Sequence, residues 1–397
     1  MPGSDGVDAR CDVLVIGGGV CGLWTLYALI EAGYSALLIE RTALGDGQTI
    51  ASQGILHAGA KYNLPGNAVD AAPAVAAAQG VWRAALAGED GVPDLSGVRA
   101  LDERTLLWTM PSLSSRAAAV GASRVMRSAV KKVARGDWPA GFAGAPRGID
   151  VYETAECVLE PASLLEELGR GNRELIGLGD VTGIESTAAG VRVRLDDRGV
   201  TRVFACGAAI LTAGAGNEGL LDLAGVDGSA LMQRRALHQI VAVGTPFDLN
   251  GHCLQMSVDK PALTVTTGML DGARTWYFGG QPAEDGVGLS ESDQILAGQR
   301  AAARCLPWVD LAGVDWRVFE IDRAEGRTAG GKRPSEATVV WGNDRVIAAW
   351  PTKLVLAPRA ADLVIERLGE RGILPGGVDG SGDLLSLPRA GVAGRVW

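Results

Sequence analysis

Apolar residues near the start of the chain change their spacing twice. Residues 13–16 form a short β-branched run, the residues up to about 32 repeat with a helical period, and a second apolar run ends at Glu40. A short apolar run indicates a buried strand, and a period near 3.6 indicates a helix. The pattern therefore predicts a strand–helix–strand unit over residues 11–41.

Three glycines stand where the first strand meets the helix, with the spacing G-x-G-x-x-G. The first allows a tight turn, the second lets the backbone approach a pyrophosphate, and the third lets the helix pack on the sheet. The helix N-terminus attracts phosphates, and Glu40 lies where an acid accepts from a ribose hydroxyl. The unit is predicted to bind an adenine dinucleotide. Its expected contacts are Gly17, Gly19, Val20, Cys21, Gly22, Glu40 and Arg41.

Residues 44–59 mix glycine, serine, threonine and glutamine with apolar residues. Small residues let a backbone approach a ligand closely, and hydroxyl and amide groups hydrogen-bond to it. The segment resembles the flavin-wrapping stretch of the D-amino-acid oxidase-like family of FAD-dependent oxidoreductases, which includes glycine and sarcosine oxidases, glycerol-3-phosphate dehydrogenases and L-2-hydroxyglutarate oxidases. The resemblance implies FAD rather than NAD as the cofactor. It places Gln48, Thr49, Ser52, Gln53 and Gly54 along the flavin.

Two later segments extend this resemblance. Residues 208–216 are similar to the family's strand and Ala-Gly turn near the dinucleotide. Residues 333–358 are similar to its closing segment, where an Arg-Pro pair precedes a strand, a loop at the flavin and a final helix, here expected over about 358–368. The contacts implied by the resemblance are Val181 at the adenine, Ala213 and Gly214 near the dinucleotide, and Pro351, Thr352, Lys353 and Leu354 at the flavin.

These motifs imply an α/β fold with a Rossmann-like FAD-binding domain of GR2 type, interrupted by a second domain. Strand patterns at residues 237–243, 262–267 and 275–279 come without predicted helices between them, which indicates a mostly antiparallel sheet. Substrate is expected between the two domains. The expected boundaries are 8–75, 150–232 and 326–372 for the FAD-binding domain, 76–149 and 233–325 for the substrate domain, and 373–397 for a flexible tail.

Composition narrows the class of protein further. The 397 residues are 47% hydrophobic and carry a net charge of −9, which indicates a globular protein without a basic face for nucleic acid. We expect no membrane span and no signal peptide, and a disordered tail over Met1–Arg10. Six scattered cysteines without a C-x-x-C pair predict neither structural disulfides nor a metal site, and fit a cytoplasmic location.

Three histidines are the candidates for proton transfer. Oxidation of a CH–OH carbon needs a group that takes the hydroxyl proton, whereas an amine can bind in its neutral form. His57 stands in a context similar to that of hydroxyl-oxidising family members, so it is expected as base or electrostatic partner at the flavin. A structural hydrogen bond and covalent attachment of FAD are its alternatives. His238 either lines the substrate cavity or is buried in a sheet, and His252 is expected in a loop.

Cationic residues are the candidates for holding the substrate. A guanidinium binds a carboxylate through two hydrogen bonds, and Arg333 matches the family's Arg-Pro position, although Gly-Gly-Lys precedes it in place of an apolar run. Arg327 and Arg323 are alternatives, and an ion pair with a nearby carboxylate is the ordinary role of each. Lys353 is expected to stabilise the anionic reduced flavin or to face solvent. The aromatic residues that either wall the site or pack in the core are Trp350 and Tyr62.

Three hypotheses for the function follow. The first is an FAD-dependent oxidoreductase that takes a hydride from a small carboxylate-bearing substrate at a CH–OH carbon, of the 2-hydroxy-acid or polyol-phosphate type. The second is an amine or amino-acid oxidase or dehydrogenase resembling glycine oxidase. The third is a flavoprotein subunit without catalytic activity. The electron acceptor is O₂, a quinone or a redox protein, and most of the FAD is expected to be bound without a covalent link.

Overall fold

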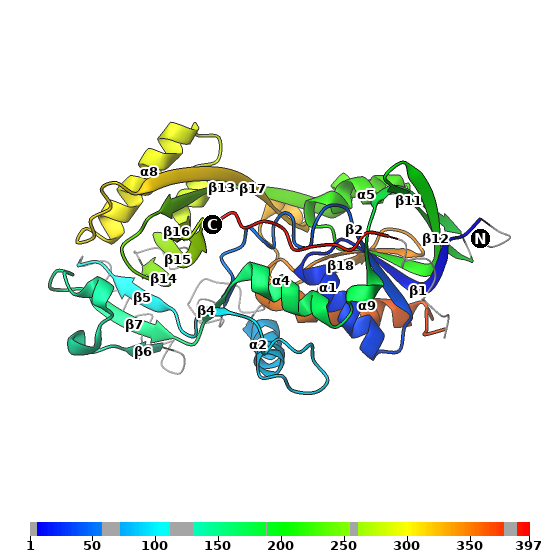
Figure 1. The fold of residues 1–397 in the computed structure, drawn as a ribbon, viewed down its shortest axis with the longest axis horizontal. Coiled ribbons are helices and arrows are strands. Elements are labelled where there is room, and N and C mark those ends of the chain that lie inside the picture. Colours follow the sequence, from blue (N-terminus) through cyan, green and yellow to red (C-terminus); the bar gives the residue numbers. More distant parts are fainter. Residues whose placement is uncertain (1–5, 58–71, 112–129, 188, 255–260, 377–386) are drawn as a thin grey trace.

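Two large β-sheets lie toward opposite ends of an elongated molecule (Figure 1). The structure is a computed structural model and describes residues 6–57, 72–111, 130–187, 189–254, 261–376 and 387–397. A small third sheet takes its strands from distant parts of the chain. These strands are β3 (Ile55–Leu56), β4 (Ala100–Asp102) and β8 (Cys157–Leu159).

The first sheet contains the predicted strand–helix–strand unit. Its strands are β1 (Ala9–Ile16), β2 (Ala36–Glu40), β9 (Ile176–Leu178), β10 (Asp180–Thr187), β11 (Gly190–Asp197), β12 (Val200–Leu211), β18 (Thr338–Trp341) and β19 (Val346–Trp350). Their order is β10-β11-β12-β1-β2-β9, with β19 beside β12 and β18 beside β19. Strands β1, β2, β9, β12 and β19 run parallel. A parallel sheet is covered on both faces, which explains why residues 13–16 are all apolar.

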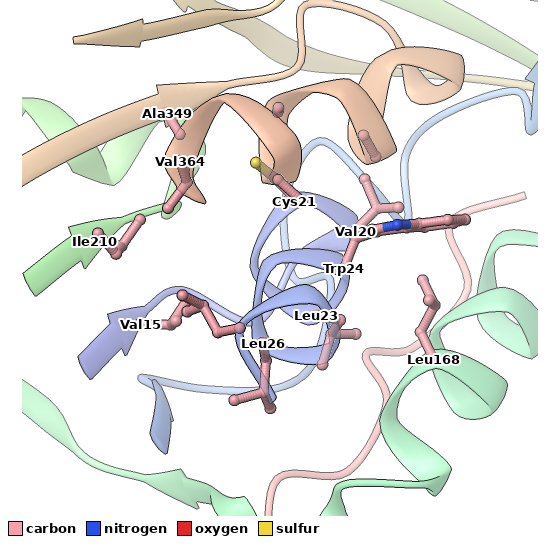
Figure 2. Close-up of a cluster of buried hydrophobic side chains, with 14 of the residues drawn as sticks. Val15, Val20, Cys21, Leu23, Trp24, Leu26, Leu168, Ile210, Ala349 and Val364 are labelled. Atoms are coloured by element: carbon pink, nitrogen blue, oxygen red, sulfur yellow. The ribbon is translucent and has the colours of Figure 1, made fainter. Parts of the chain in front are cut away.

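Helix α1 (Val20–Glu31) is apolar on nearly every side because the fold surrounds it. It packs against the first sheet, against α4 (Pro161–Arg170) and against α9 (Ala357–Glu370). Figure 2 shows Leu168 of α4 and Val364 of α9 close to the side chains of α1. Helix α9 confirms the prediction of a final helix over about 358–368.

The second sheet is mostly antiparallel, as the sequence predicts. Its strands are β5 (Leu106–Thr109), β6 (Val130–Lys132), β7 (Asp150–Thr154), β13 (Met232–Val243), β14 (Gly251–Leu254), β15 (Leu263–Leu270), β16 (Ala273–Gly279) and β17 (Asp315–Gly326). Their order is β17-β13-β16-β15-β14-β5-β7-β6, and β14 pairs with β5 in parallel. The expected class, a Rossmann-like α/β sheet joined to a mostly antiparallel one, is confirmed.

Two helices that the sequence analysis missed lie between β16 and β17. They are α7 (Gln281–Asp285) and α8 (Glu291–Cys305), and both follow the three predicted strands, between which the described residues form no helix. The buried face of α8 consists largely of small residues such as Gly298 and Ala302, which give a weak apolar period. The other helices are α2 (Ala72–Leu86), α5 (Asn217–Leu223) and α6 (Gly228–Leu231). Among the described residues, no helix is long and apolar enough to cross a membrane.

The second sheet has an outer and an inner face, because side chains alternate along each strand. On the outer face, Ile240 of β13 packs in one apolar cluster with Ala302 of α8. On the opposite face, Val241 packs with Tyr277. We call this second side the inner face. By strand register it carries Arg235, Gln239, Val241, His252, Thr264, Thr266, Tyr277, Phe319 and Arg323.

The start of the described chain is held on the first sheet. The Asp8 carboxylate accepts a hydrogen bond from the Val203 N–H at 2.7 Å, and β1 begins at Ala9. The expected tail over Met1–Arg10 is therefore wrong for residues 8–10. The reason is that an edge of β12 is available to pair with the incoming strand.

The flexible tail expected over residues 373–397 is wrong for residues 387–397. The Trp397 side chain is 5% exposed, and its indole N–H donates to the Ser52 carbonyl oxygen at 3.0 Å. Its ring packs on Tyr277 with 5.1 Å between ring centroids. The glycines of this region indicate flexibility in the sequence, but the large apolar area of the tryptophan and several backbone hydrogen bonds to residues outside the segment dock it.

Replacing Trp397 with alanine tests this docking. We expect Trp397→Ala to lower the free energy of unfolding by about 3–5 kcal/mol, as for other buried tryptophans. Urea unfolding followed by circular dichroism measures the change. The neighbouring Val396→Ala is the control, because Val396 is 36% exposed. Equal stability of the two variants would contradict a stabilising contact of the Trp397 side chain.

Candidate functional site

A cavity of about 710 Å³ runs along the first sheet. It is lined by the β1–α1 turn, the end of β2, residues 41–52 and the loop after β19. Most of the contacts predicted from the sequence lie on its wall. These are Gly17, Gly19, Val20, Cys21, Glu40, Arg41, Gln48, Thr49, Ser52, Val181, Ala213, Gly214, Pro351, Lys353 and Leu354.

The glycines of the β1–α1 turn leave no room for side chains. Gly17 has a φ of +113°, and a Cβ there would lie 2.5 Å from the Ala213 nitrogen. A Cβ on Gly22 would lie 1.9 Å from the Gly17 carbonyl oxygen, so this glycine lets α1 approach the sheet. Gly19 borders the cavity, which keeps the backbone of the helix N-terminus open to a ligand. The turn therefore fits the pyrophosphate of an adenine dinucleotide.

The Glu40 carboxylate is fixed at the end of β2 by backbone donors. One oxygen accepts from the Gly18 N–H at 2.7 Å, and the other accepts from the N–H groups of Arg41 and Thr42 at 2.8 and 3.0 Å. These hydrogen bonds hold the carboxylate on the cavity wall, where it can accept from ribose hydroxyls. The position predicted for Glu40 thus agrees with the role proposed for it.

Residues 48–57, which we call the wrapping segment, lie between this cavity and the inner face. The side-chain oxygen of Gln48 accepts from the Ala324 N–H of β17 at 3.0 Å. The buried Tyr277 hydroxyl donates to the Ala51 carbonyl oxygen at 2.6 Å. The second sheet therefore holds the segment at two points along its length.

Four of the expected cofactor contacts do not border the cavity: Gly22, Gln53, Gly54 and Thr352. The Gln53 amide donates to the Thr266 hydroxyl and to the Tyr277 carbonyl oxygen, at 3.2 and 2.9 Å. Gly54 lets β3 approach β8, since a Cβ there would lie 1.9 Å from the carbonyl oxygen of Leu159. The Thr352 hydroxyl donates to the Glu336 carbonyl oxygen at 3.0 Å.

The sequence analysis missed the part of the wall that comes from the second sheet. This part includes Ala236 of β13 and Glu320, Asp322 and Ala324 of β17. Nothing in the sequence near these residues indicates a nucleotide site, because they reach the cavity only through the pairing of β13 with β17.

His57 lies close to two buried side chains from distant parts of the chain. Its Nδ1 lies 3.4 Å from one oxygen of Glu156, and the other oxygen lies 3.3 Å from Nε2 of His252. Glu156 is 1% exposed and His252 is 0% exposed. His252 lies in β14, so the expectation of a loop position is wrong. Glu156 could not be found from the sequence, because about 100 positions separate each member of the cluster from the next.

His238 lies away from this cluster. It lies on the same face of β13 as Ile240, the outer face. Its Nδ1 is hydrogen-bonded to the Gly286 carbonyl oxygen at 3.0 Å. Gln294 of α8 donates to its backbone oxygen at 2.6 Å. His238 is buried in the sheet and is not among the residues that line the cavity.

The three candidate arginines have different surroundings. Arg333 is exposed, and Arg327 is exposed and donates to the carbonyl oxygens of Ser229 and Met232. Arg323 lies on the inner face and pairs with Glu284 at 3.0 Å. Burial lowers its pKa, and its Nε is buried without a hydrogen-bond partner among the described residues.

Another arginine of the inner face is neutralised. Arg235 stands opposite Arg323 in the pairing of β13 with β17, and it forms a two-pronged ion pair with Glu325 at 2.7 and 2.5 Å. Glu325 is 0% exposed. This pairing leaves Arg323 as the inner-face guanidinium with a donor available for a ligand.

Lys353 lies on the cavity wall, as predicted. Burial lowers its pKa from the ordinary value of 10.5 to about 8, and the charge of Arg333 adds to this effect while Glu325 opposes it. Trp350 also lines the cavity, and its indole N–H donates to the Gly214 carbonyl oxygen at 3.1 Å. Tyr62 lies outside the described residues.

Comparisons with known proteins agree with this geometry. The model of the DAO family, described as FAD dependent oxidoreductase, matches residues 12–340. The probable FAD-dependent oxidoreductase PA4991 of Pseudomonas aeruginosa is 38% identical, over 97% of this chain and 97% of its own. The crystal structure of PA4991 matches with a TM-score of 0.79 at 34% identity, covering 100% of this chain and 99% of that one.

Two more distant structures share the fold. An L-α-glycerophosphate oxidase from Mycoplasma pneumoniae, with FAD bound, has a TM-score of 0.67 at 15% identity and covers 97% of both chains. A glycine oxidase from Geobacillus kaustophilus has a TM-score of 0.64 at 16% identity, over 91% of this chain and 95% of that one. At these identities the likeness concerns the fold alone.

The glycine turn gives a direct test of cofactor binding. We expect the purified protein to be yellow with one FAD per chain, and Gly19→Leu to lose most of its FAD on gel filtration, because the side chain would occupy the space of the pyrophosphate. The control is Gly80→Leu in α2, where a Cβ has no atom within 4 Å. Equal FAD content in the two variants would contradict the cavity as the cofactor site.

The lowered pKa of Lys353 predicts a pH-dependent stability of the FAD-free protein. Below pH 8 the folded protein holds a buried charge, so Lys353→Met should be more stable than the wild type. Between about pH 8 and 10.5 the unfolded chain keeps a proton that the folded chain has released, so the stability of the wild type rises relative to the variant. Thermal unfolding from pH 6 to 10 should show this difference shrink. A constant difference would contradict the lowered pKa.

Proposed function

This chain belongs to the DAO family of FAD-dependent oxidoreductases, and we propose that it oxidises a CH–OH carbon of a small carboxylate-bearing substrate, of the 2-hydroxy-acid or polyol-phosphate type. The observation that carries the proposal is the meeting of His57 with Glu156 and His252 at the end of the wrapping segment. Bound FAD supplies the acceptor for the hydride. The residues of this chain must bind the substrate and act on its hydroxyl group.

Oxidation of an alcohol needs a protein group that acts on the hydroxyl proton, whereas oxidation of an amine does not need one for the amine. A hydroxyl keeps its proton at neutral pH, so its oxidation requires a base or an electrostatic partner, and an amine can enter already neutral. His57 is 30% exposed in its side chain, while Glu156 behind it is buried, so the imidazole can meet a substrate while the carboxylate fixes its ring. This arrangement supports the alcohol over the amine.

Arg323 is the candidate for binding an anionic group that lies away from the reacting carbon, because three strands separate β17, which carries it, from β14, which carries His252. It stands on the same face of the second sheet as His252, and its Nε is the buried donor described above. Arg327 is engaged by two carbonyl oxygens, and Arg333 lies on an exposed loop. Lys353 adds positive charge on the cavity wall, near where the family resemblance places the flavin.

Oxidation of an amine or amino acid is the second candidate. The fold does not choose between the two, because an enzyme named for glycerophosphate and one named for glycine share it with this chain. The electron acceptor and the cytoplasmic location stay predictions from the sequence.

His57→Ala tests the role of the histidine. With the most reactive hydroxy acid of a panel, the rate of flavin reduction under anaerobic rapid mixing should fall by roughly 10²–10⁴-fold, the usual worth of a group that acts on the proton. Binding of the substrate should change less, because this contribution is made mainly in the transition state.

The matched control is His238→Ala, which removes a buried imidazole from the outer face of the second sheet. It should reduce the flavin at nearly the rate of the wild type. A His57→Ala variant that is reduced as fast as this control would exclude His57 from the reaction.

A further inference from the structure

The cluster of His57, Glu156 and His252 joins three parts of the fold. His57 follows β3, Glu156 precedes β8, and His252 lies within β14 of the second sheet. One atom of each side chain, either an imidazole nitrogen or a carboxylate oxygen, lies within 4.8 Å of the corresponding atoms of the other two. Two of the three side chains are fully buried. The cluster is therefore a compact set of two imidazoles and one carboxylate.

The separations within the cluster are those of ligands that could share one ion. A charged N–H···O hydrogen bond is about 2.7–2.9 Å long, whereas Glu156 lies 3.4 Å from His57 and 3.3 Å from His252. Two ligands bound tetrahedrally to one ion, with bonds of about 2.0–2.1 Å, are separated by about 3.3 Å. The observed separations fit this second geometry, and the 3.3 Å between Glu156 and His252 also falls within the range of a hydrogen bond.

Neighbouring groups orient the side chains in the way that metal ligands require. The Thr264 hydroxyl is hydrogen-bonded to Nδ1 of His252 at 2.8 Å, which aims Nε2 at Glu156. The backbone N–H of Glu156 donates to the Thr154 hydroxyl at 3.1 Å. Metal-binding histidines commonly have their second ring nitrogen held in this manner.

The backbone at His57 is held as well. The Gln79 amide of α2 donates to the His57 carbonyl oxygen at 3.0 Å. His57 therefore enters the cluster from a fixed backbone, just as His252 does from its strand. A site that is already shaped in the protein reduces the ordering cost of binding an ion.

We propose that His57, Glu156 and His252 bind one divalent cation of the zinc, iron or manganese class. Two imidazoles and a carboxylate suit these ions and leave coordination positions open. A hydroxy acid carries hydroxyl and carboxylate oxygens that can fill such positions. The binding of the ion does not depend on which substrate is oxidised, and with an ion present His57 acts on the substrate through that ion.

Metal analysis of the purified holoenzyme tests the proposal. Elemental analysis should find about one zinc, iron or manganese per flavin. After removal by a chelator, titration with zinc chloride against a chromophoric chelator should show one saturable site. Glu156→Gln and His252→Ala should each weaken zinc binding by roughly 100-fold or more, the upper range for loss of even a supporting group. His238→Ala should bind zinc like the wild type, because its imidazole lies on the outer face.

The flavin spectrum and the thermal unfolding midpoint of each variant show that it has folded. If a variant fails to fold, anomalous diffraction at the zinc edge on wild-type crystals replaces it, and a peak between the three side chains is expected. Absence of metal in the holoenzyme together with no saturable zinc binding would overturn the proposal, and so would zinc binding in Glu156→Gln and His252→Ala equal to that of His238→Ala. None of these measurements uses a substrate, so their failure leaves the proposed oxidation of a CH–OH carbon to be judged separately.

Discussion

The placement of the wrapping segment between the two sheets is the constraint on which the candidate site depends. Tyr277 and Trp397, which stack on each other, bind its backbone at Ala51 and Ser52. Gln53 crosses to β15 and β16 in the same way. These contacts present one side of the segment to the dinucleotide cavity and deliver His57 at its end to Glu156 and His252. If the two sheets separated, both the cavity wall and the histidine cluster would come apart.

Local physics explains why the nucleotide half was predictable. A buried parallel strand must be apolar, a tight turn over a phosphate must be glycine, and a ribose needs an acceptor at the next strand end. Each requirement is met by neighbours in sequence, from Gly17 to Glu40. The second sheet could be expected as antiparallel for the same reason, because its strands have short turns.

The remaining features depend on contacts between distant residues. Alternation along β13 predicts that His238 and Gln239 lie on opposite faces of the sheet. The sequence does not show which face packs on α8, because the buried residues of that helix are small and give little apolar periodicity. Glu156 can be recognised as part of a site only through its contacts with His57 and His252, each about 100 positions away in the sequence. The docking of residues 387–397 depends on Trp397 and on backbone hydrogen bonds to residues far away in the sequence. The sequence alone likewise does not favour Arg323 over Arg333, because the interaction partners of each side chain are known only from the structure.

Charge is distributed unevenly over the inner face. The histidine cluster lies toward β14, while Arg235 and Arg323 stand toward β13 and β17, and the Arg235 charge is offset by Glu325. A substrate with an oxygen to be activated and an anionic group some distance from it would match both regions. The lowered pKa values of Arg323 and Lys353 have burial as their largest cause, which indicates positive charges kept away from water where a ligand anion could stabilise them.

The most direct test of the central claim, oxidation at a CH–OH carbon, is anaerobic titration of the yellow protein with pairs of hydroxy and amino acids that share a carbon skeleton. Loss of the flavin absorbance band reports reduction without any assumption about the electron acceptor. The account predicts that a hydroxy acid bleaches the flavin and that the matching amino acid does not. Bleaching by an amino acid, with none by its hydroxy counterpart, would contradict it.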